Sequence, residues 1–151
     1  MVDYKKLKQL RKETGVSLSL CKKALEEAKN DIAKARQKLI QWGGSKAEEK
    51  AGRVTKQGGI FSYTHHNNKI SSLVELQCET DFVAENRQFQ ELGKELAMQV
   101  ASSGANTLEE LFEQVYIREP EKKIKDLLKE AVLKFGENIK VTRFLRWRLG
   151  E

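Results

Sequence analysis

Apolar side chains recur at every third or fourth position in three short stretches of residues 1–43, the spacing of amphipathic helices. The stretches contain Tyr4, Leu7 and Leu10, then Leu20, Cys21, Ala24, Leu25 and Ala28, then Ile32, Ala35, Leu39 and Ile40. Gly15 can end the first helix, and Asp31 can cap the third. Ser17 or Ser19 can cap the second. We therefore predict a compact three-helix domain over residues 1–43.

The helical pattern is interrupted at Gly43 and Gly44, and the stretch SKAEEKAGRVTKQ that follows at 45–57 has almost no large apolar residue. This composition is typical of a solvated linker. Its start can be helical, because Ala, Glu and Lys are good helix formers. We therefore place a linker at 44–58 and a second domain at 59–151.

The second domain opens with two segments of alternating character, GIFSYTHH and ISSLVELQC, both rich in β-formers. Asn67, Asn68 and Lys69 separate them. Because Asn tolerates the positive φ of tight turns, the two segments are expected to pair as an antiparallel hairpin.

Three helices are expected between this hairpin and the last strand. The first carries Phe89, Leu92, Leu96 and Val100 at core spacing. Thr107 and Glu110 form a capping-box pattern that opens the second helix. Pro120 is suited to begin the third helix, and Gly136 to end it.

The final segment, NIKVTRFLRWRL, returns to strand chemistry. Strict alternation places Val141, Leu145, Trp147 and Leu149 on one face with Arg143. The other face then holds Thr142, Phe144, Arg146 and Arg148.

The predicted fold class is α+β. Residues 59–151 should form a three-stranded antiparallel sheet that helices cover on one face. The second face, to which we assign Tyr63, also needs a cover, and the aromatic strand ends suggest a second copy of the chain. A homodimer is therefore expected.

Composition limits the class of protein. The hydrophobic share of 39% and the charged share of 33% are typical of a folded globular chain. No apolar run approaches the ~20 residues that cross a bilayer, and the sequence MVDYKKLKQL lacks the apolar centre of a signal peptide. We therefore expect a cytoplasmic protein with no membrane partner. Cys21 and Cys78 lie in apolar patterns, so buried thiols without a disulfide are expected.

Motifs of catalysis are nearly absent from the sequence. It has no phosphate-binding glycine loop, and its two cysteines lack the paired spacing of zinc sites. His65 and His66 are adjacent, so on a strand they point to opposite faces and cannot easily bind one metal. Cys78 with either histidine is the only candidate nucleophile pair, although its alternation places Cys78 in the core. We therefore expect a binding protein, not an enzyme, with no cofactor and no metal.

Basic charge leaves nucleic acid open as a partner. The net charge is +6, but most Lys and Arg alternate with Glu along helices, which is typical of solvated faces. Only RFLRWRL at 143–149 combines Arg with aromatic residues, as single-strand binders do. A half-buried terminal strand explains that pattern better. A basic RNA- or ribosome-binding protein is therefore the alternative function, and no direct contact with nucleic acid is expected.

The stretch CETDFVAENRQF at 78–89 places Asp81 beside Phe82, where a strand ends and a helix is about to begin. Connections of this kind usually lie on the surface. Residue chemistry alone favours a structural interpretation, in which Asp81 caps the helix and Phe82 packs on its own core.

Three segments resemble the elongation factor Ts family. LRKETGVSLSLCKKALEEAKNDIAKA resembles its opening helical domain, in which L-R-x-x-T-G precedes a C-K-K-A-L helix and an A-x-x-D-I-x-x-A helix. CETDFVAEN resembles its T-D-F-V-A signature, and GENIKVTRF its G-E-N-I-x-V-R-R-F. The segments occur in the family's order, and the resemblance runs from about Leu7 to the end of the chain.

The resemblance implies a guanine nucleotide exchange factor for elongation factor Tu, the GTPase that delivers aminoacyl-tRNA to the ribosome. It implies that Asp81 and Phe82, with Thr80 and Val83, disturb the nucleotide site of that GTPase. The phenyl ring is then expected to enter between helices of the GTPase domain and to disturb its Mg²⁺ and phosphate site.

The resemblance also implies that a UBA-like N-terminal domain docks on the GTPase through Arg11, Leu18, Ser19 and Lys22. The family's G-A-G-M-M-D stands here as GVSLSL, so Leu18 keeps an apolar side chain and Ser19 replaces a methionine. One core is present, as in the short members that dimerise, which again implies a homodimer.

Overall fold

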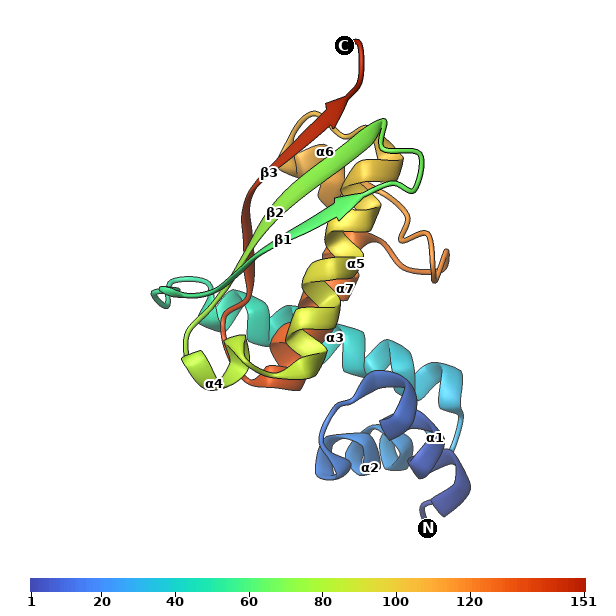
Figure 1. The fold of residues 1–151 in the computed structure, drawn as a ribbon. Helices are drawn as coiled ribbons and strands as arrows, with labels where there is room; N and C mark the ends of the chain where they lie inside the picture. The colour runs from blue at the N-terminus through green and yellow to red at the C-terminus, as the bar shows by residue number, and fades with distance from the viewer. The chain divides into compact units, whose positions relative to one another are not determined.

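The computed structural model describes residues 1–151, which divide into two compact units (Figure 1). The first unit comprises Met1–Gly52 with Leu128–Glu137, and the second Arg53–Leu127 with Asn138–Glu151. The first is helical, whereas the second combines a three-stranded antiparallel sheet with helices. The predicted α+β class is therefore confirmed. None of the helices combines the length and apolar character that spanning a membrane requires.

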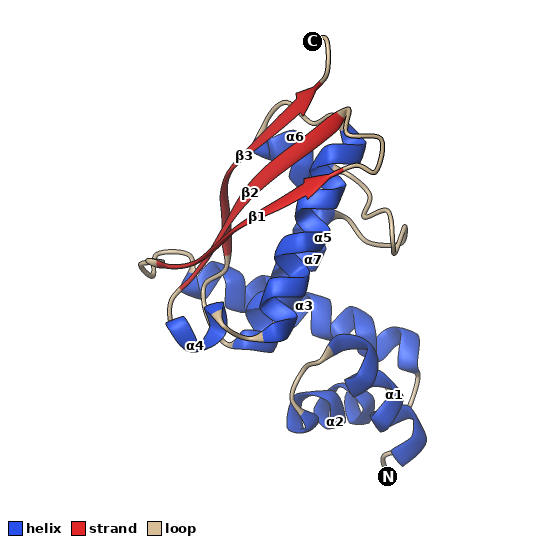
Figure 2. Cartoon of the chain, in the orientation of Figure 1, coloured by secondary structure: helices blue, strands red, loops and turns tan.

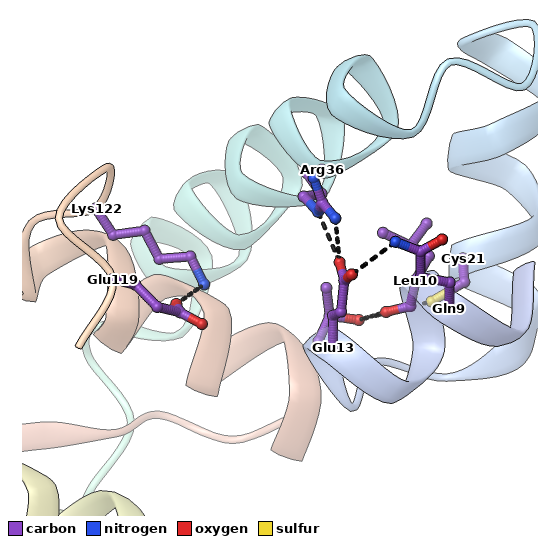
Figure 3. A network of polar contacts seen from close by, with 8 residues as sticks. Gln9, Leu10, Glu13, Cys21, Arg36, Glu119 and Lys122 are labelled. Carbon is purple, nitrogen blue, oxygen red and sulfur yellow. Dashed lines mark hydrogen bonds and ion pairs between the residues drawn. The ribbon is translucent and has the colours of Figure 1, made fainter. Parts of the chain in front are cut away.

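The first unit begins with three helices: α1 (Tyr4–Thr14), α2 (Leu18–Glu27) and α3 (Ile32–Lys50). Gly15 ends α1 with a φ of 68°, and the side chains of Ser17 and Asp31 cap α2 and α3, as the sequence predicted. Gln9 and Arg36 both donate hydrogen bonds to the Glu13 carboxylate (Figure 3). The apolar faces of the helices form one core, which includes Leu10, Val16, Cys21, Leu25 and Leu39.

The prediction that the helical pattern stops at Gly43 was wrong, because α3 continues through Gly43 and Gly44 to Lys50. Gly43 is buried, and a Cβ added there would lie 2.6 Å from the carbonyl oxygen of Lys129 in α7 (Ile124–Phe135). Gly43 therefore permits a close crossing of two helix backbones. The domain boundaries at 1–43, 44–58 and 59–151 stay a prediction.

The sheet of the second unit has the order β1-β2-β3, with β1 at Gln57–Thr64, β2 at Ile70–Cys78 and β3 at Lys140–Arg148 (Figure 2). Both neighbouring pairs are antiparallel. Asn68 takes a φ of 60° in the turn between β1 and β2, so the predicted hairpin is confirmed.

Four helices lie between β2 and β3 in the chain: α4 (Asp81–Ala84), α5 (Arg87–Ser103), α6 (Leu108–Glu113) and α7. α5 lies against β1 and β2 (Figure 1). Phe61 of β1 makes an edge contact with Phe89 of α5, with 6.2 Å between the ring centroids. Its ring also lies against Gly93, where any Cβ would overlap it, so a glycine lets the helix approach the strand.

The third predicted helix begins later than expected, at Ile124 rather than at Pro120. Residues 115–123 form instead a folded loop, closed by a β-bridge between Val115 and Lys123. Buried Gln99 of α5 holds the loop, because its Nε2 donates to the Val115 carbonyl at 3.0 Å and its Oε1 accepts from the Ile117 N–H at 3.1 Å.

Two residues, Tyr63 and Val141, lie on the opposite face of the sheet from the one predicted. Tyr63 pairs with Ser72, which is 2% exposed and donates to a carbonyl of α5, so Tyr63 lies on the helix-covered face and its predicted assignment was wrong. A β-bulge in β3 also moves Val141. Glu75 pairs with Arg143 but Leu76 pairs with Val141, so Val141 turns inward and is 5% exposed.

Candidate functional site

A four-residue helix, α4, presents Phe82 to solvent directly after β2. Thr80 caps this helix, and its side-chain oxygen accepts a hydrogen bond from the Val83 N–H at 3.4 Å. The Phe82 side chain is 87% exposed. Asp81 is also exposed, and its carbonyl accepts a hydrogen bond from the Glu85 N–H at 2.9 Å. The charged residue and the ring therefore stand together on the surface.

The structural interpretation of this stretch was wrong on both counts. Thr80, not Asp81, is the cap of α4, and Asn86 caps α5 through a hydrogen bond from the Gln88 N–H. Phe82 does not fill the core of its own chain. The phenylalanine that packs in the core is Phe89, which belongs to the next helix, α5, and is fully buried.

Anchors on both sides define where α4 stands. Cys78 ends β2 with a fully buried side chain, as predicted, and its Sγ donates to the Thr80 carbonyl at 3.2 Å. On the other side, buried Phe89 fixes the start of α5. The exposed ring is therefore carried by a short segment between two core positions.

Two residues beside the turn were missed by sequence reasoning. Glu79 accepts a hydrogen bond at 2.7 Å from the N–H of Asn138, which is 3% exposed. Each residue belongs to a recognisable motif, CETDFVAEN or GENIKVTRF, which was the available signal. The contact joins positions 59 residues apart, so no local pattern could reveal it.

The four predicted docking residues of the first unit lie on its surface. Arg11 belongs to α1, whereas Leu18, Ser19 and Lys22 belong to the first turns of α2, and all four are exposed. The Leu18 side chain is 48% exposed, at the first residue of α2.

That buried face includes Cys21, whose thiol lies 3.8 Å from the Thr14 hydroxyl. Burial raises the pKa of the Cys21 thiol. The predicted buried thiols are confirmed, since Cys21 and Cys78 are both buried and neither forms a disulfide.

The sheet face opposite α5 is rich in exposed apolar residues. We call it the open face, defined by Ile60, Leu73, Leu145 and Trp147. These side chains are 66%, 43%, 44% and 71% exposed. A depression of about 420 Å³ is lined by Ile60, Leu73 and Leu145 and by the ion pair of Glu75 with Arg143. The Arg143 Nε lies 2.6 Å from the Glu75 Oε2. Hydrogen bonds from Arg143 and Gln77 lower the pKa of the Glu75 carboxyl.

The structure does not bring the candidate nucleophile together with a histidine. Cys78 pairs with Gln57 at one end of the hairpin, whereas His65 follows Thr64 at the other end. The His65 Nδ1 lies 3.0 Å from the Tyr63 hydroxyl, and the His65 and His66 rings lie tilted against each other with 4.1 Å between their centroids. The histidines therefore belong to the turn of the hairpin.

An aromatic ring on an anchored turn, an exposed helical surface and an apolar sheet face are features typical of proteins that bind other macromolecules. Comparison with known proteins identifies the kind. The family model described as Elongation factor TS matches residues 79–150, and the one described as Elongation factor Ts, mitochondrial, N-terminal, matches residues 1–49. The chain belongs to the elongation factor Ts family, a family of translation elongation factors.

Three of its relatives match over 94–100% of their own length. Elongation factor Ts of Thermosipho melanesiensis is 38% identical over 196 aligned positions, which cover 100% of both chains. Elongation factor Ts of Thermotoga maritima is 39% identical over 188 positions, which cover 96% of this chain and 94% of the relative. That of Coprothermobacter proteolyticus is 38% identical, with 96% of each chain covered. The alignments are longer than the 151 residues of this chain, so they include gaps here.

Proposed function

We propose that this chain is a guanine nucleotide exchange factor that binds elongation factor Tu with GDP and promotes release of the GDP, so that GTP can bind. The observation that carries the proposal is the exposure of Phe82, at 87%, on a capped and anchored turn. Water solvates a phenyl ring poorly, so the ring gains free energy when a partner covers it.

The ring cannot open a nucleotide site by itself. Burial of one phenyl ring contributes about 2 kcal/mol, or roughly thirtyfold in affinity. A GTPase holds GDP through backbone N–H groups around the phosphates and through Mg²⁺, and these contacts must break together. Thr80, Asp81 and Val83 surround Phe82 and supply further contacts of the same turn.

A second contact in our proposal is the docking surface of the first unit, formed by Arg11, Leu18, Ser19 and Lys22. Its exposed leucine lies among polar and charged side chains, a composition typical of a modest protein interface. Docking there keeps the chain on the GTPase while the Phe82 turn competes with the nucleotide, so weak contacts at the two places reinforce one another.

The mechanism follows from linkage. If Phe82 displaces the groups that hold Mg²⁺ and phosphate, then the GTPase binds the chain best when it is empty. Thermodynamic coupling is reciprocal, so GDP and the chain must weaken the binding of each other by the same factor. Nucleotide release and nucleotide rebinding are then accelerated together.

Calorimetry tests this coupling. We expect the chain to bind nucleotide-free elongation factor Tu about 5- to 150-fold more tightly than the GDP-bound form, because coupling free energies are typically about 1–3 kcal/mol. Equal affinities for the two forms would contradict the proposal. Binding to neither form, together with a salt-sensitive gel shift on RNA, would favour the RNA- or ribosome-binding alternative.

We also propose that two copies of the chain associate through the open face. A three-stranded sheet with helices on one side leaves these apolar side chains in water, and a two-fold axis lets the same face cover itself. Light scattering at micromolar concentration should give the mass of two chains. Leu145→Arg should give the mass of one, whereas Glu109→Arg on α6 should not. A monomeric wild-type chain would exclude this dimer.

A further inference from the structure

Glu79 immediately precedes the cap of α4 and contacts two segments that are distant in sequence. Its Oε1 accepts a hydrogen bond from the Asn138 N–H at 2.7 Å and lies 3.6 Å from a guanidinium nitrogen of Arg53. Asn138 also donates from Nδ2 to the Arg53 carbonyl at 2.8 Å. All three residues belong to the second unit. We call these three contacts among Glu79, Asn138 and Arg53 the Glu79 clamp.

Burial and the charge of the Glu79 carboxylate strengthen the contacts of the Glu79 clamp. Asn138 is 3% exposed, and the Glu79 side chain is 20% exposed. A hydrogen bond from an N–H to a carboxylate is stronger than one between neutral groups. Partial burial reduces its screening by solvent and by salt. The clamp therefore ties the end of β2 to the start of β3 and to the segment before β1.

Helix α4 depends on contacts outside itself, because it has four residues and none of them is buried. A helix this short does not stabilise itself in water. Its position therefore depends on the residues at its ends. Only Glu79, Thr80 and Asp81 separate the buried Cys78 from Phe82, and the Glu79 side chain contacts segments that are distant in sequence.

We propose that Glu79 and Asn138 are positioning residues for Phe82, which hold α4 so that the ring is already placed for the GTPase in the free protein. The inference rests on the proposed exchange function. Neither residue has to touch the GTPase. A turn that is fixed in advance loses less conformational entropy on binding, so the clamp raises the efficiency of the ring that it carries.

A double-mutant cycle tests whether Glu79 acts through Phe82. Glu79→Ala should slow GDP release about fivefold in the wild-type background and less than about 1.5-fold in the Phe82→Ala background, because residues that act as one unit are not additive. Glu79→Gln keeps an acceptor oxygen for the Asn138 N–H and should stay within about twofold of wild type. Glu109→Ala removes a carboxylate from α6 and serves as the control. Equal losses from Glu79→Ala in both backgrounds would overturn the inference.

Amide hydrogen exchange in the free chain tests the clamp without the GTPase. The Ala84 and Glu85 amides donate within the α4 turn, at 3.2 Å and 2.9 Å. Glu79→Ala should accelerate their exchange about tenfold, while the amides of α5 keep their protection. Unchanged exchange at Ala84 and Glu85 would overturn the inference, whatever the nucleotide assay gives.

The two experiments distinguish a failure of the proposed function, or a variant that does not fold, from a failure of the inference about Glu79. A wild-type chain that does not accelerate GDP release contradicts the proposed function, and the amide measurement still decides the clamp. If Glu79→Ala does not fold, Glu79→Asp replaces it, since this variant keeps the charge but shortens its reach to Asn138. Glu79→Asp should then show the faster α4 exchange, and normal protection would again overturn the inference.

Discussion

Phe82 is a large apolar side chain that the fold leaves in solvent, so its truncation should separate function from stability. We expect Phe82→Ala to slow GDP release from elongation factor Tu at least about tenfold, because one buried ring contributes about 2 kcal/mol. The unfolding midpoint should stay within about 2 °C of wild type, because exposed positions contribute little to folding. Stopped-flow fluorescence and calorimetry measure the two effects.

The control for Phe82→Ala is Ile117→Ala, which truncates another exposed apolar side chain, 57% exposed, on the loop of residues 115–123. It should leave GDP release unchanged. Normal release by Phe82→Ala would show that another group acts on the GTPase. A large loss of stability would instead place the ring among the contacts of the fold.

Burial of Tyr116 makes the free energy of unfolding depend on pH in the alkaline range. Its side chain is 7% exposed, and its hydroxyl donates to Glu95 at 3.3 Å. Burial, together with the neighbouring Glu95 charge, raises the pKa of Tyr116 from 10.0 to about 12. Because the folded state favours the neutral phenol, the stabilising contribution is complete below pH 10 and is lost as the pH rises toward 12.

Denaturant unfolding at several pH values checks this contribution. The free energy of unfolding should fall less steeply above pH 10 in Tyr116→Phe than in wild type. Tyr4→Phe, which removes the hydroxyl of a side chain that is 72% exposed, is the matched control. Identical slopes in the two variants would show that Tyr116 does not titrate as its surroundings require.

At single residues, the sequence predicted those contacts that are local. Capping by Ser17 and Asp31 follows from side chains one turn away from the N–H groups that they accept from, and both caps are present. The burial of Cys78 follows from alternation along one strand. The Glu79 clamp could not be predicted, because the segments that meet there are brought together only by the complete sheet.

At the scale of elements, Gly43 and Gly44 differ in a way that two matched variants can measure. A Cβ at Gly43 meets the Lys129 carbonyl oxygen at 2.6 Å, whereas one at Gly44 meets only the Lys129 side chain, at 3.7 Å. Gly43→Ala should lose about 1–2 kcal/mol, because overpacking of a backbone contact exceeds the gain in helix propensity. Gly44→Ala should gain up to about 1 kcal/mol.

Thermal and denaturant unfolding of the two glycine variants provide the measurement. A stabilised Gly43→Ala would mean that α3 and α7 do not cross closely there. A destabilised Gly44→Ala would mean that the helix needs the flexibility of the second glycine. The same pair explains the error at this element: two glycines in sequence look like a stop, but one of them serves a tertiary contact.

The elements themselves were largely predictable, because periodicity is a property of each segment alone. The hairpin, the last strand and the helix over Arg87–Ser103 all have the predicted type. Their irregularities were not predictable. The bulge that turns Val141 inward depends on pairing with β2, and the late start of α7 depends on the loop that Gln99 holds.

At the scale of the whole molecule, the α+β class and the covering of the sheet on one side followed from the order of the segments. The division into two compact units did not follow in full. The first unit includes Leu128–Glu137 from late in the chain. No pattern along the sequence indicates that this segment belongs with the opening helices.

The central claim is that the whole chain accelerates nucleotide exchange on elongation factor Tu. The most direct test mixes the wild-type chain with elongation factor Tu loaded with a fluorescent GDP, in the presence of excess unlabelled nucleotide. We predict that the release rate rises with the concentration of the chain and then saturates, at a value at least about a hundredfold above spontaneous release, as a coupling of about 3 kcal/mol permits. A release rate equal to the spontaneous rate at every concentration would contradict the claim.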